Sequence, residues 1–468
     1  MSLKIYNTLS GQKEDFVPVK ENKVNIYVCG PTVYDYSHIG HARSVVVFDT
    51  VVRYFRFLGY KVTYVRNFTD VDDKIIKRAN ETKMTSEEVS LKFIDEFTKD
   101  MTALNALKPD FEPKATEHIN EIVALVQDLI EKGYAYEVEG DVYFRVEKFE
   151  DYGKLSGRSL EDMKAGARIE IDKRKESPFD FALWKSAKQG EPYWETPFGK
   201  GRPGWHIECS AMSSKYLGES FDIHGGGKDL IFPHHENEIA QSEAVHGKNF
   251  VKYWMHNGFV RIDHEKMSKS LNNFLTIKDT LKSWHPEVVR FFLLSKHYRS
   301  PIDFTDDSLK EAEASLDRIY SFFERIENFK SDFGNQEKSS FWNEFIEAMN
   351  DDFNTAKAIG VIFEGVREAN RLIDSGENTK KANLIANEIV KMGNCLGILF
   401  LTPEDYFKNK PSKSDLEITP EEIENLIEER KTARTNKDFQ RADEIRDELL
   451  EKGVVLEDKP GKTIWKFA

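Results

Sequence analysis

Four residues in one short segment, Cys29, His38, Gly40 and His41, are of types that bind metals or phosphates. A thiolate and an imidazole are typical zinc ligands. A glycine between two histidines also suits a phosphate where a strand leads into a helix, because the backbone is accessible and the helix start is partly positive. Paired histidines at a helix start are more often capping or surface residues. This segment alone therefore leaves metal, phosphate and structural roles open.

A second segment, Lys266-Met267-Ser268-Lys269-Ser270, places two lysines and two serines in a polar stretch that follows an expected strand. Lysines at such a place could neutralise a departing pyrophosphate, and this task suits a hydrated loop that closes around the transition state. The alternative is a solvated charged turn. Taken together, the two segments favour a nucleotide-binding enzyme.

A βαβ unit must position the first segment. Residues 24–28 are rich in β-branched and aromatic types and precede a Gly-Pro pair, which predicts a strand with Cys29 at its carboxyl end. Apolar residues recur at helical spacing over 44–58, and residues 61–68 read as a second strand. Ligands of such units bind at the carboxyl ends of the strands, which is where Cys29 and the histidines fall.

The fold class expected for the whole chain is α/β: a Rossmann-type parallel-sheet domain split by an insertion, followed by a helical bundle and a small C-terminal domain. A hairpin pattern after residue 134 marks the insertion, and long amphipathic stretches begin near residue 306. The predicted boundaries are 1–125 and 196–260 for the two halves of the sheet domain, 126–195 for the insertion, 261–305 for the lysine loop and the region after it, 306–405 for the helical bundle, and 406–468 for a linker and the last domain.

The composition is that of a protein without membrane segments. The chain has 468 residues, of which 40% are hydrophobic, and it lacks an apolar run of about 18 residues and a signal-peptide pattern. We therefore expect a cytoplasmic protein.

A net charge of −14 argues against non-specific binding to nucleic acid, although a local basic stripe would be enough to bind RNA. Three cysteines cannot form a disulfide framework, and Cys395, at an apolar helix end, is expected to be a buried thiol.

The two segments resemble the His-Ile-Gly-His and Lys-Met-Ser-Lys-Ser signatures of class I aminoacyl-tRNA synthetases. Residues 205–212 and 222–238 are similar to cysteinyl-tRNA synthetases, and the similarity continues through 351–356 and 442–447. The resemblance implies an ATP-dependent cysteine–tRNA ligase that acts as a monomer on L-cysteine, ATP with Mg²⁺, and tRNA(Cys). It also implies that residues 261–305 form the lysine loop and a stem-contact region, that the helical bundle binds tRNA and that the C-terminal domain binds the anticodon. Asn272 stands where many members have glycine, which bears on the flexibility of the lysine loop.

The resemblance further implies one Zn²⁺ per chain, held by Cys29, Cys209, His234 and Glu238. His234 and Glu238 are four residues apart in a helix-like segment, so their side chains share one face. By spacing alone the two distant cysteines would be read as buried thiols. Zn²⁺ binds a thiolate far better than an alcohol, which would separate cysteine from serine without editing. Four protein ligands normally mark a closed site, so the substrate sulfur would need a fifth position or a loosened Glu238.

The same resemblance assigns the other site residues. His38 and His41 would steady the charge that develops at the phosphates, and Lys266 and Lys269 would stabilise pyrophosphate. The expected ATP-binding residues are His38, Gly40, His41, Lys266, Ser268 and Lys269. The expected cysteine-binding residues are Cys29, Gly30, Thr69, Trp205 and His206. Because no side-chain nucleophile is required, catalysis would consist of positioning and electrostatics.

For tRNA, the stretch 430–446 contains several basic residues at roughly helical spacing. A solvated helix pair with i,i+4 ion pairs explains this pattern equally well, since acidic residues are as frequent there. The resemblance favours an anticodon-binding surface, with Trp465 or Phe439 as a stacking platform. The expected contacts are Arg434, Lys437, Arg441, Asp443 and Arg446.

Two other functions are consistent with parts of the sequence. A ligase that joins cysteine to a small amine, of the mycothiol-pathway type, has a similar catalytic core but lacks the C-terminal region, whereas this chain continues well past residue 306. A non-catalytic, zinc-containing RNA-binding relative would typically have lost one signature segment, and both are intact here.

Overall fold

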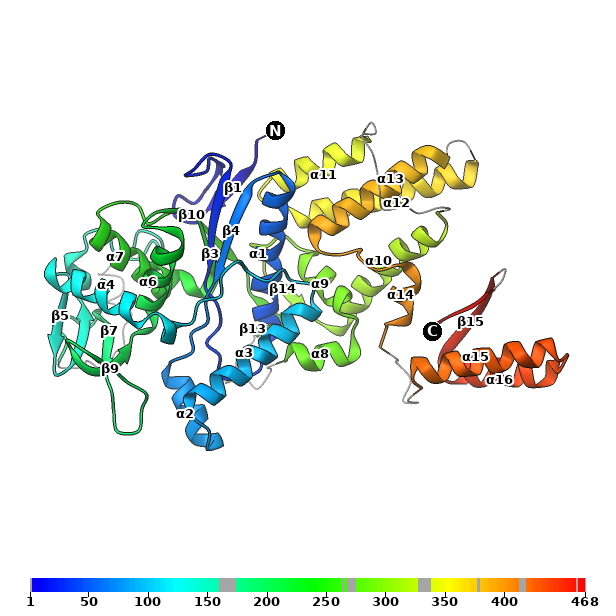
Figure 1. Ribbon diagram of the computed structural model, residues 1–468. Helices are drawn as coiled ribbons and strands as arrows, with labels where there is room; N and C mark the ends of the chain where they lie inside the picture. Colours follow the sequence, from blue (N-terminus) through cyan, green and yellow to red (C-terminus); the bar gives the residue numbers. More distant parts are fainter. Residues whose placement is uncertain are drawn as a thin grey trace.

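The structure is a computed structural model, and it describes residues 2–159, 174–262, 265–266, 275–326, 338–376, 379–411, 418–459 and 462–467. A central sheet separates an inserted domain on one side from a helical region on the other, and a small C-terminal unit lies at the far end of the molecule (Figure 1). The expected α/β class with a helical bundle and a separate C-terminal domain is confirmed.

The central sheet has four parallel strands in the order β11-β10-β3-β4. Their bounds are β3 Lys23–Val28, β4 Lys61–Arg66, β10 Phe221–Gly227 and β11 Val251–Asn257. The chain leaves β3 for β4 on one side, whereas β10 and β11 lie on the other, so the order of the strands reverses between β3 and β10. Ligands of open parallel sheets bind at such a switch point, beyond the carboxyl ends of the strands. Cys29 follows β3 directly at this edge.

Helices cover both faces of the sheet, as expected of a buried parallel sheet (Figure 1). Helix α1 (Ile39–Phe57) packs on one face, in one apolar core with Ile26, and α6 (Trp205–Leu217) and α7 (Glu236–His246) pack on the other, in a core with Tyr27. Alternate residues of β3 thus enter different cores, which is the period of a strand. The helix predicted over 44–58 begins earlier, at Ile39, because His38 caps it and His41 lies in its first turn.

The inserted domain is a five-stranded antiparallel sheet in the order β5-β6-β7-β9-β8, with α4 (Ile119–Glu131) in the same apolar core. The strands are β5 Ala135–Val138, β6 Asp141–Phe144, β7 Phe181–Ser186, β8 Trp194–Thr196 and β9 Gly199–Pro203. The sheet therefore continues to Pro203, past the predicted end of the insertion at residue 195. Strand β9 carries two glycines, a proline and two basic residues, so its sequence reads as a turn and its pairing with β7 and β8 makes it a strand.

The remaining elements connect the sheet to the helical bundle and complete the chain. Near the sheet lie β1 (Lys4–Asn7), β2 (Gln12–Asp15), α2 (Asp73–Thr82), α3 (Ser86–Ala103), β12 (Val260–Ile262), β13 (Glu265–Lys266), α8 (Ile277–Ser283), α9 (Pro286–Leu294) and β14 (Ile302–Phe304). The helical bundle contains α10 (Asp306–Glu324), α11 (Ser340–Asn350), α12 (Thr355–Ser375), α13 (Thr379–Leu396) and α14 (Pro403–Lys408). The C-terminal unit contains α15 (Pro420–Thr435), α16 (Phe439–Glu451), β15 (Val454–Lys459) and β16 (Lys462–Phe467). Within the described part of the chain, every helix is too short or too polar to cross a membrane.

A buried ion pair joins the sheet domain to the helices that follow it. Asp49 of α1 accepts hydrogen bonds from Arg290 of α9, from Arg53 and from the backbone of Leu107. Asp49 and Arg290 are both 1% exposed or less. Removing one partner of such a pair leaves a buried charge uncompensated, so we expect Asp49→Ala to lower the free energy of unfolding by about 3 to 5 kcal/mol.

Urea denaturation of the whole chain tests this expectation. Asp95→Ala is the matched control, since Asp95 forms an i,i+4 pair with Lys99 on the exposed face of α3 and its loss should leave stability almost unchanged. Equal midpoints for Asp49→Ala and Asp95→Ala would show that the buried pair does not hold the two regions together.

Candidate functional site

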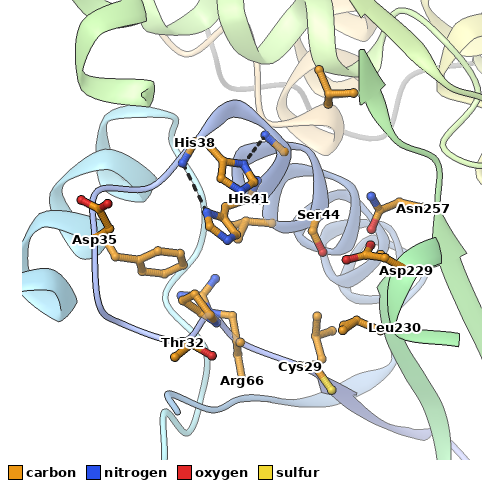
Figure 2. Close-up of a pocket in the computed structure, with 18 of the residues that line it drawn as sticks. Cys29, Thr32, Asp35, His38, His41, Ser44, Arg66, Asp229, Leu230 and Asn257 are labelled. Atoms are coloured by element: carbon orange, nitrogen blue, oxygen red, sulfur yellow. Dashed lines mark hydrogen bonds between the residues drawn. The ribbon is translucent and has the colours of Figure 1, made fainter. Parts of the chain in front are cut away.

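A cavity of about 380 Å³ opens at the switch point of the sheet. Its wall combines the end of β3, the start of α1 and the ends of β10 and β11 (Figure 2). Cys29, His38, Gly40, His41 and Trp205 line it, as the sequence led us to expect. Its volume is that of a typical small-molecule site.

The two histidines begin α1 as a reciprocal cap. The Nδ1 atom of His38 accepts hydrogen bonds from the backbone N–H groups of Gly40 and His41, at 3.1 and 3.3 Å, and Nδ1 of His41 accepts one from the His38 N–H at 3.3 Å. Their rings stack with centroids 3.8 Å apart. Because each Nδ1 accepts, the neutral rings carry their proton on Nε2 and are donors there. The sequence left phosphate-binding and capping roles open for these histidines, and the structure shows that they cap the helix at the cavity wall.

Beside the cavity, Cys29, Cys209, His234 and Glu238 converge. Their ligand atoms all lie within 4.8 Å of one another, with Sγ of Cys29 3.7 Å from Sγ of Cys209 and Nε2 of His234 3.0 Å from Glu238. Three of the four are buried, and Cys29 is half-buried at the cavity wall. Two sulfurs, one nitrogen and one carboxylate oxygen form a donor set that fits Zn²⁺.

The charges of this cluster favour a cation at its centre. Burial alone would raise the pKa of Glu238, but His224 and His234 outweigh it and hold the pKa at about 2. A hydrogen bond from Cys29 lowers the pKa of Cys209 to about 6. Burial would lower the pKa of His234, but Glu238 raises it to about 10. A proton on His234 thus balances two anionic ligands, and a bound metal ion would take its place.

A second set of possible metal ligands overlaps the first. It consists of Cys29, His224, His235 and Glu238, and sequence reasoning did not single out its two histidines as ligands. Nε2 of His235 lies 3.3 Å from the sulfur of Cys29, and its Nδ1 lies 2.8 Å from Nε2 of His256. His224 in β10 and His256 in the neighbouring strand β11 were the available sequence signal for this network.

Two of the expected cysteine-binding residues lie outside the cavity lining. The Thr69 side chain is buried and donates its hydroxyl hydrogen bond to Glu208 at 2.8 Å. Nδ1 of His206 lies 2.9 Å from Nδ1 of His234, and the Trp205 ring stacks on the His234 ring with centroids 4.3 Å apart. Thr69 and His206 thus contact Glu208 and His234, whereas Gly30 and Trp205 line the cavity.

The lysine segment leads out of the cavity wall. Lys266 pairs with Arg261 through the backbone in β13, and its side chain is not described. Ser268, Lys269 and Asn272 lie outside the described residues. After the segment, the backbone returns to the histidine motif, since the N–H of Ile39 bonds to the carbonyl of Leu275 and the N–H of Ile277 to that of Ser37. Both ends of the lysine segment are therefore held beside the cavity.

Helix α3 borders the same region and carries a buried acid with a raised pKa. Oδ2 of Asp100 has no hydrogen-bond partner among the described residues, and burial together with Glu96 raises the pKa of Asp100 to about 6. The unfolded value is about 3.9, so the folded state holds this proton more tightly. The contribution of Asp100 to stability is therefore most favourable below about pH 4 and is lost as the pH rises to about 6.

Asp100→Asn should remove the loss of stability that accompanies ionisation of Asp100. We expect the variant to exceed the parent in stability at pH 7 by on the order of 1 kcal/mol and to match it near pH 4. Thermal unfolding followed from pH 4 to 7 checks the slope, and a variant that is less stable at pH 7 would show that the Asp100 charge is compensated.

In the C-terminal unit, the basic residues form ion pairs. Arg430 makes two hydrogen bonds to Asp458 at 2.9 Å, Arg434 also pairs with Asp458, and Arg441 pairs with Glu429. They lie on two helices rather than one, and Lys437, in the turn between them, has a φ of 62°. Asp443 and Arg446 are exposed. The ion-paired helix pair, which the sequence left open, is the observed arrangement.

The two aromatic candidates differ in exposure. Trp465 is 4% exposed and donates its Nε1 hydrogen bond to Glu424, so the expectation that it offers a stacking surface is wrong. It fills the small apolar core of the unit, where no other large aromatic side chain is found among the described residues. Phe439 is 61% exposed at the start of α16 and stays a candidate.

Comparison with known proteins places the fold in a class. Residues 15–314 match the family described as tRNA synthetases class I (C) catalytic domain, and residues 344–401 match the DALR domain. The methionyl-tRNA synthetase of Mycobacterium tuberculosis in complex with methionyl-adenylate superposes with a TM-score of 0.57 at 14% identity, over 80% of this chain and 89% of that one. A LeuRS–tRNA–LeuAMS complex from Agrobacterium radiobacter gives a TM-score of 0.59 at 11% identity, over 82% and 84%. The fold and the signature histidines are thus those of a class I aminoacyl-tRNA synthetase.

Relatives of higher sequence identity show which amino-acid family within this class the chain belongs to. Residues 418–465 match the cysteinyl-tRNA ligase anticodon binding domain. A cysteine–tRNA ligase from Geobacter metallireducens is 57% identical over the full length of both chains, and one from Thermodesulfovibrio yellowstonii is 53% identical over 99% of each. The chain belongs to the cysteine–tRNA ligase family.

Proposed function

We propose that this chain activates L-cysteine with ATP and transfers it to the 3′ end of tRNA(Cys) in the cytoplasm. A carboxylate oxygen of cysteine attacks the α-phosphorus of ATP, which carries Mg²⁺, and pyrophosphate leaves. A ribose hydroxyl of the tRNA then takes the acyl group and AMP leaves. One observation carries this proposal: a single cavity joins Cys29 of the metal-ligand cluster to the histidine cap of α1.

At the phosphate end of the cavity, His38 and His41 act as donors. Their Nε2–H groups and the positive end of α1 stabilise charge on the α-phosphate in the transition state. Lys266 and Lys269 neutralise the departing pyrophosphate, and Gly40 and Ser268 complete the ATP site. These side chains form no covalent bond with the substrate, so they contribute to catalysis through positioning and electrostatics.

At the other end, we assign Zn²⁺ to Cys29, Cys209, His234 and Glu238 rather than to the overlapping set. The first set has two sulfurs, and soft thiolate ligands favour zinc. The bound ion supplies a preference for a thiolate over an alcohol, and this distinguishes cysteine from serine. His235 and His224 then serve as outer hydrogen-bond partners that orient Cys29 and Glu238.

The substrate side chain has little space beside this cluster. Trp205 covers His234, and Gly30 lies so close to the next strand that a Cβ there would come within 1.6 Å of the carbonyl oxygen of Asn67. The backbone at Gly30 can therefore approach Asn67 only with glycine, and the cavity wall beside Cys29 stays flat. We infer that Cys29, Gly30 and Trp205 contact the substrate directly.

The C-terminal unit is proposed to bind the anticodon. Phe439 and the turn containing Lys437 form its exposed basic and aromatic tip, with Arg434, Arg441 and Arg446 on the flanking helices. Stacking of a base on an exposed ring is the usual way in which unpaired RNA is bound. The ion pairs of Arg434 and Arg441 must open, or share their acids, for these residues to contact phosphates.

Aminoacylation with labelled cysteine tests the function. The zinc-loaded protein should attach cysteine to a tRNA transcript with a GCA anticodon, and the product should be a base-labile ester on the RNA. Cysteine that becomes attached only to a small amine would instead support the ligase alternative, and protein that binds the RNA without consuming ATP would support the non-catalytic alternative.

A further inference from the structure

Arg66 is a buried cation in the wall of the cavity that the roles above do not use. It is the last residue of β4, it lines the cavity, and it is only 4% exposed. Figure 2 shows it between Thr32 and Cys29, on the side of the cavity opposite Asp229 and Asn257. Its Cγ lies 3.4 Å from where a Cβ of Gly30 would stand, so it is in contact with the segment that follows β3.

The hydrogen bonds of Arg66 are incomplete. Nη2 donates to Glu112 at 2.8 Å, and the guanidinium lies 4.9 Å from the centre of the Phe97 ring. Among the described residues, Nε and Nη1 have no hydrogen-bond partner. A buried donor left without an acceptor costs about 1 to 3 kcal/mol. An anionic ligand atom in the cavity would remove this cost, and a guanidinium binds carboxylates and phosphates best.

The position of Arg66 favours one anion. In cysteine the carboxyl carbon is separated from the sulfur by only two carbons, so a molecule whose sulfur lies at Cys29 holds its carboxylate a few ångströms away. That place is the wall between Cys29 and the phosphate end at His41, which Arg66 borders (Figure 2). The other ordinary cation of the lining, Lys74, is exposed on α2 and lies over the Tyr34 ring.

We propose that Arg66 binds the carboxylate of the substrate cysteine and positions it for attack on ATP; this inference rests on the proposed function. Glu112 holds the guanidinium from behind, which limits its rotation. The contact makes the site selective for an amino acid over a thiol amine of the same length that lacks the carboxylate.

The test compares the binding of cysteine and of cysteamine, which has the thiol and the amine but no carboxylate, to the zinc-loaded full-length protein by calorimetry. Arg66→Gln should weaken cysteine binding about 10- to 100-fold, the value of one charge-assisted hydrogen-bonded contact, and leave cysteamine binding unchanged. In the parent protein, cysteine should bind more tightly than cysteamine.

Glu112→Gln is the matched control, because it removes the same ion pair but keeps the cation. Its cysteine affinity should stay within a few-fold of the parent. If the two variants lose cysteine affinity equally, or if Arg66→Gln weakens cysteamine as much as cysteine, Arg66 is a structural residue and the proposal is overturned. Should Arg66→Gln not fold, Arg66→Lys gives the same comparison with the charge kept and is expected to show an intermediate loss of cysteine affinity.

Binding is read directly, so this test is separate from that of the proposed function. A parent protein that binds cysteine through Arg66 but forms no adenylate would contradict the proposed reaction and leave the Arg66 contact standing.

Discussion

Replacing Cys209 by alanine is expected to release zinc and to lower cysteine activation by about 10³-fold, the scale of several kcal/mol that a bound metal contributes to a site. Cys209 is buried, and its sulfur lies 3.7 Å from the sulfur of Cys29. Its loss removes one of the two sulfur donors that we assign to the metal, while Glu238, with a pKa of about 2, stays ionised at neutral pH beside His224 and His234. Zinc content by mass spectrometry and the rate of ATP–pyrophosphate exchange measure the two effects.

Cys395→Ala is the matched control. The Cys395 thiol is buried in the helical bundle, and burial raises its pKa to about 12, which makes it an inert side chain. This variant should keep its zinc and its exchange rate. A Cys209→Ala protein that holds one zinc ion per chain would contradict the assigned ligand set.

The two overlapping ligand sets can be separated by the same assay. His234→Asn should lose zinc if Cys209 and His234 are ligands, whereas His235→Asn should keep it and bind it more weakly, by about 10- to 100-fold, as expected for a hydrogen-bond partner of a ligand. The opposite result would move the metal to the set that contains His224 and His235.

The second large effect is expected at Lys269. Lys269→Ala should lower cysteine-dependent pyrophosphate exchange about 10²-fold or more, the cost of removing one preorganised donor to a transition state. The affinity for cysteine should be unchanged, because the lysine segment leaves the cavity wall at β13 and returns at Leu275, beside the histidine motif rather than at Cys29.

Lys278→Ala provides the comparison for this variant. Lys278 follows the same segment on α8, and its ammonium group is already held in an ion pair with Glu96 at 3.0 Å. It should exchange pyrophosphate at nearly the parental rate. Near-normal exchange by Lys269→Ala would show that the second signature does not act on pyrophosphate.

The first βαβ unit could be predicted from the sequence because its pattern is local. Alternating β-rich residues ahead of Cys29 and a helical period up to Leu58 predicted β3 and α1, and the rule that ligands bind at the carboxyl ends of strands placed the cavity. Capping was one of the roles that the sequence left open for the two histidines. Its reciprocal form could not be predicted, since histidine is not among the preferred capping residues and each ring accepts from the backbone of the other's turn.

The metal-ligand cluster depends on contacts that no spacing reveals. Cys29 follows β3 and Cys209 lies on α6, which packs on the sheet, and the family resemblance rather than the spacing identified them. The His235–His256 contact likewise depends on how the π-helical turn before α7 packs on β11. Trp465 was misjudged because a seven-residue apolar core needs its largest side chain inside.

Cysteine-dependent ATP–pyrophosphate exchange, run beside serine on the zinc-loaded protein, tests the central claim most directly. The account predicts rapid exchange with cysteine and almost none with serine, and it predicts that removal of zinc abolishes the exchange with cysteine. Equal exchange with the two amino acids, or cysteine exchange that survives complete removal of zinc, would contradict it.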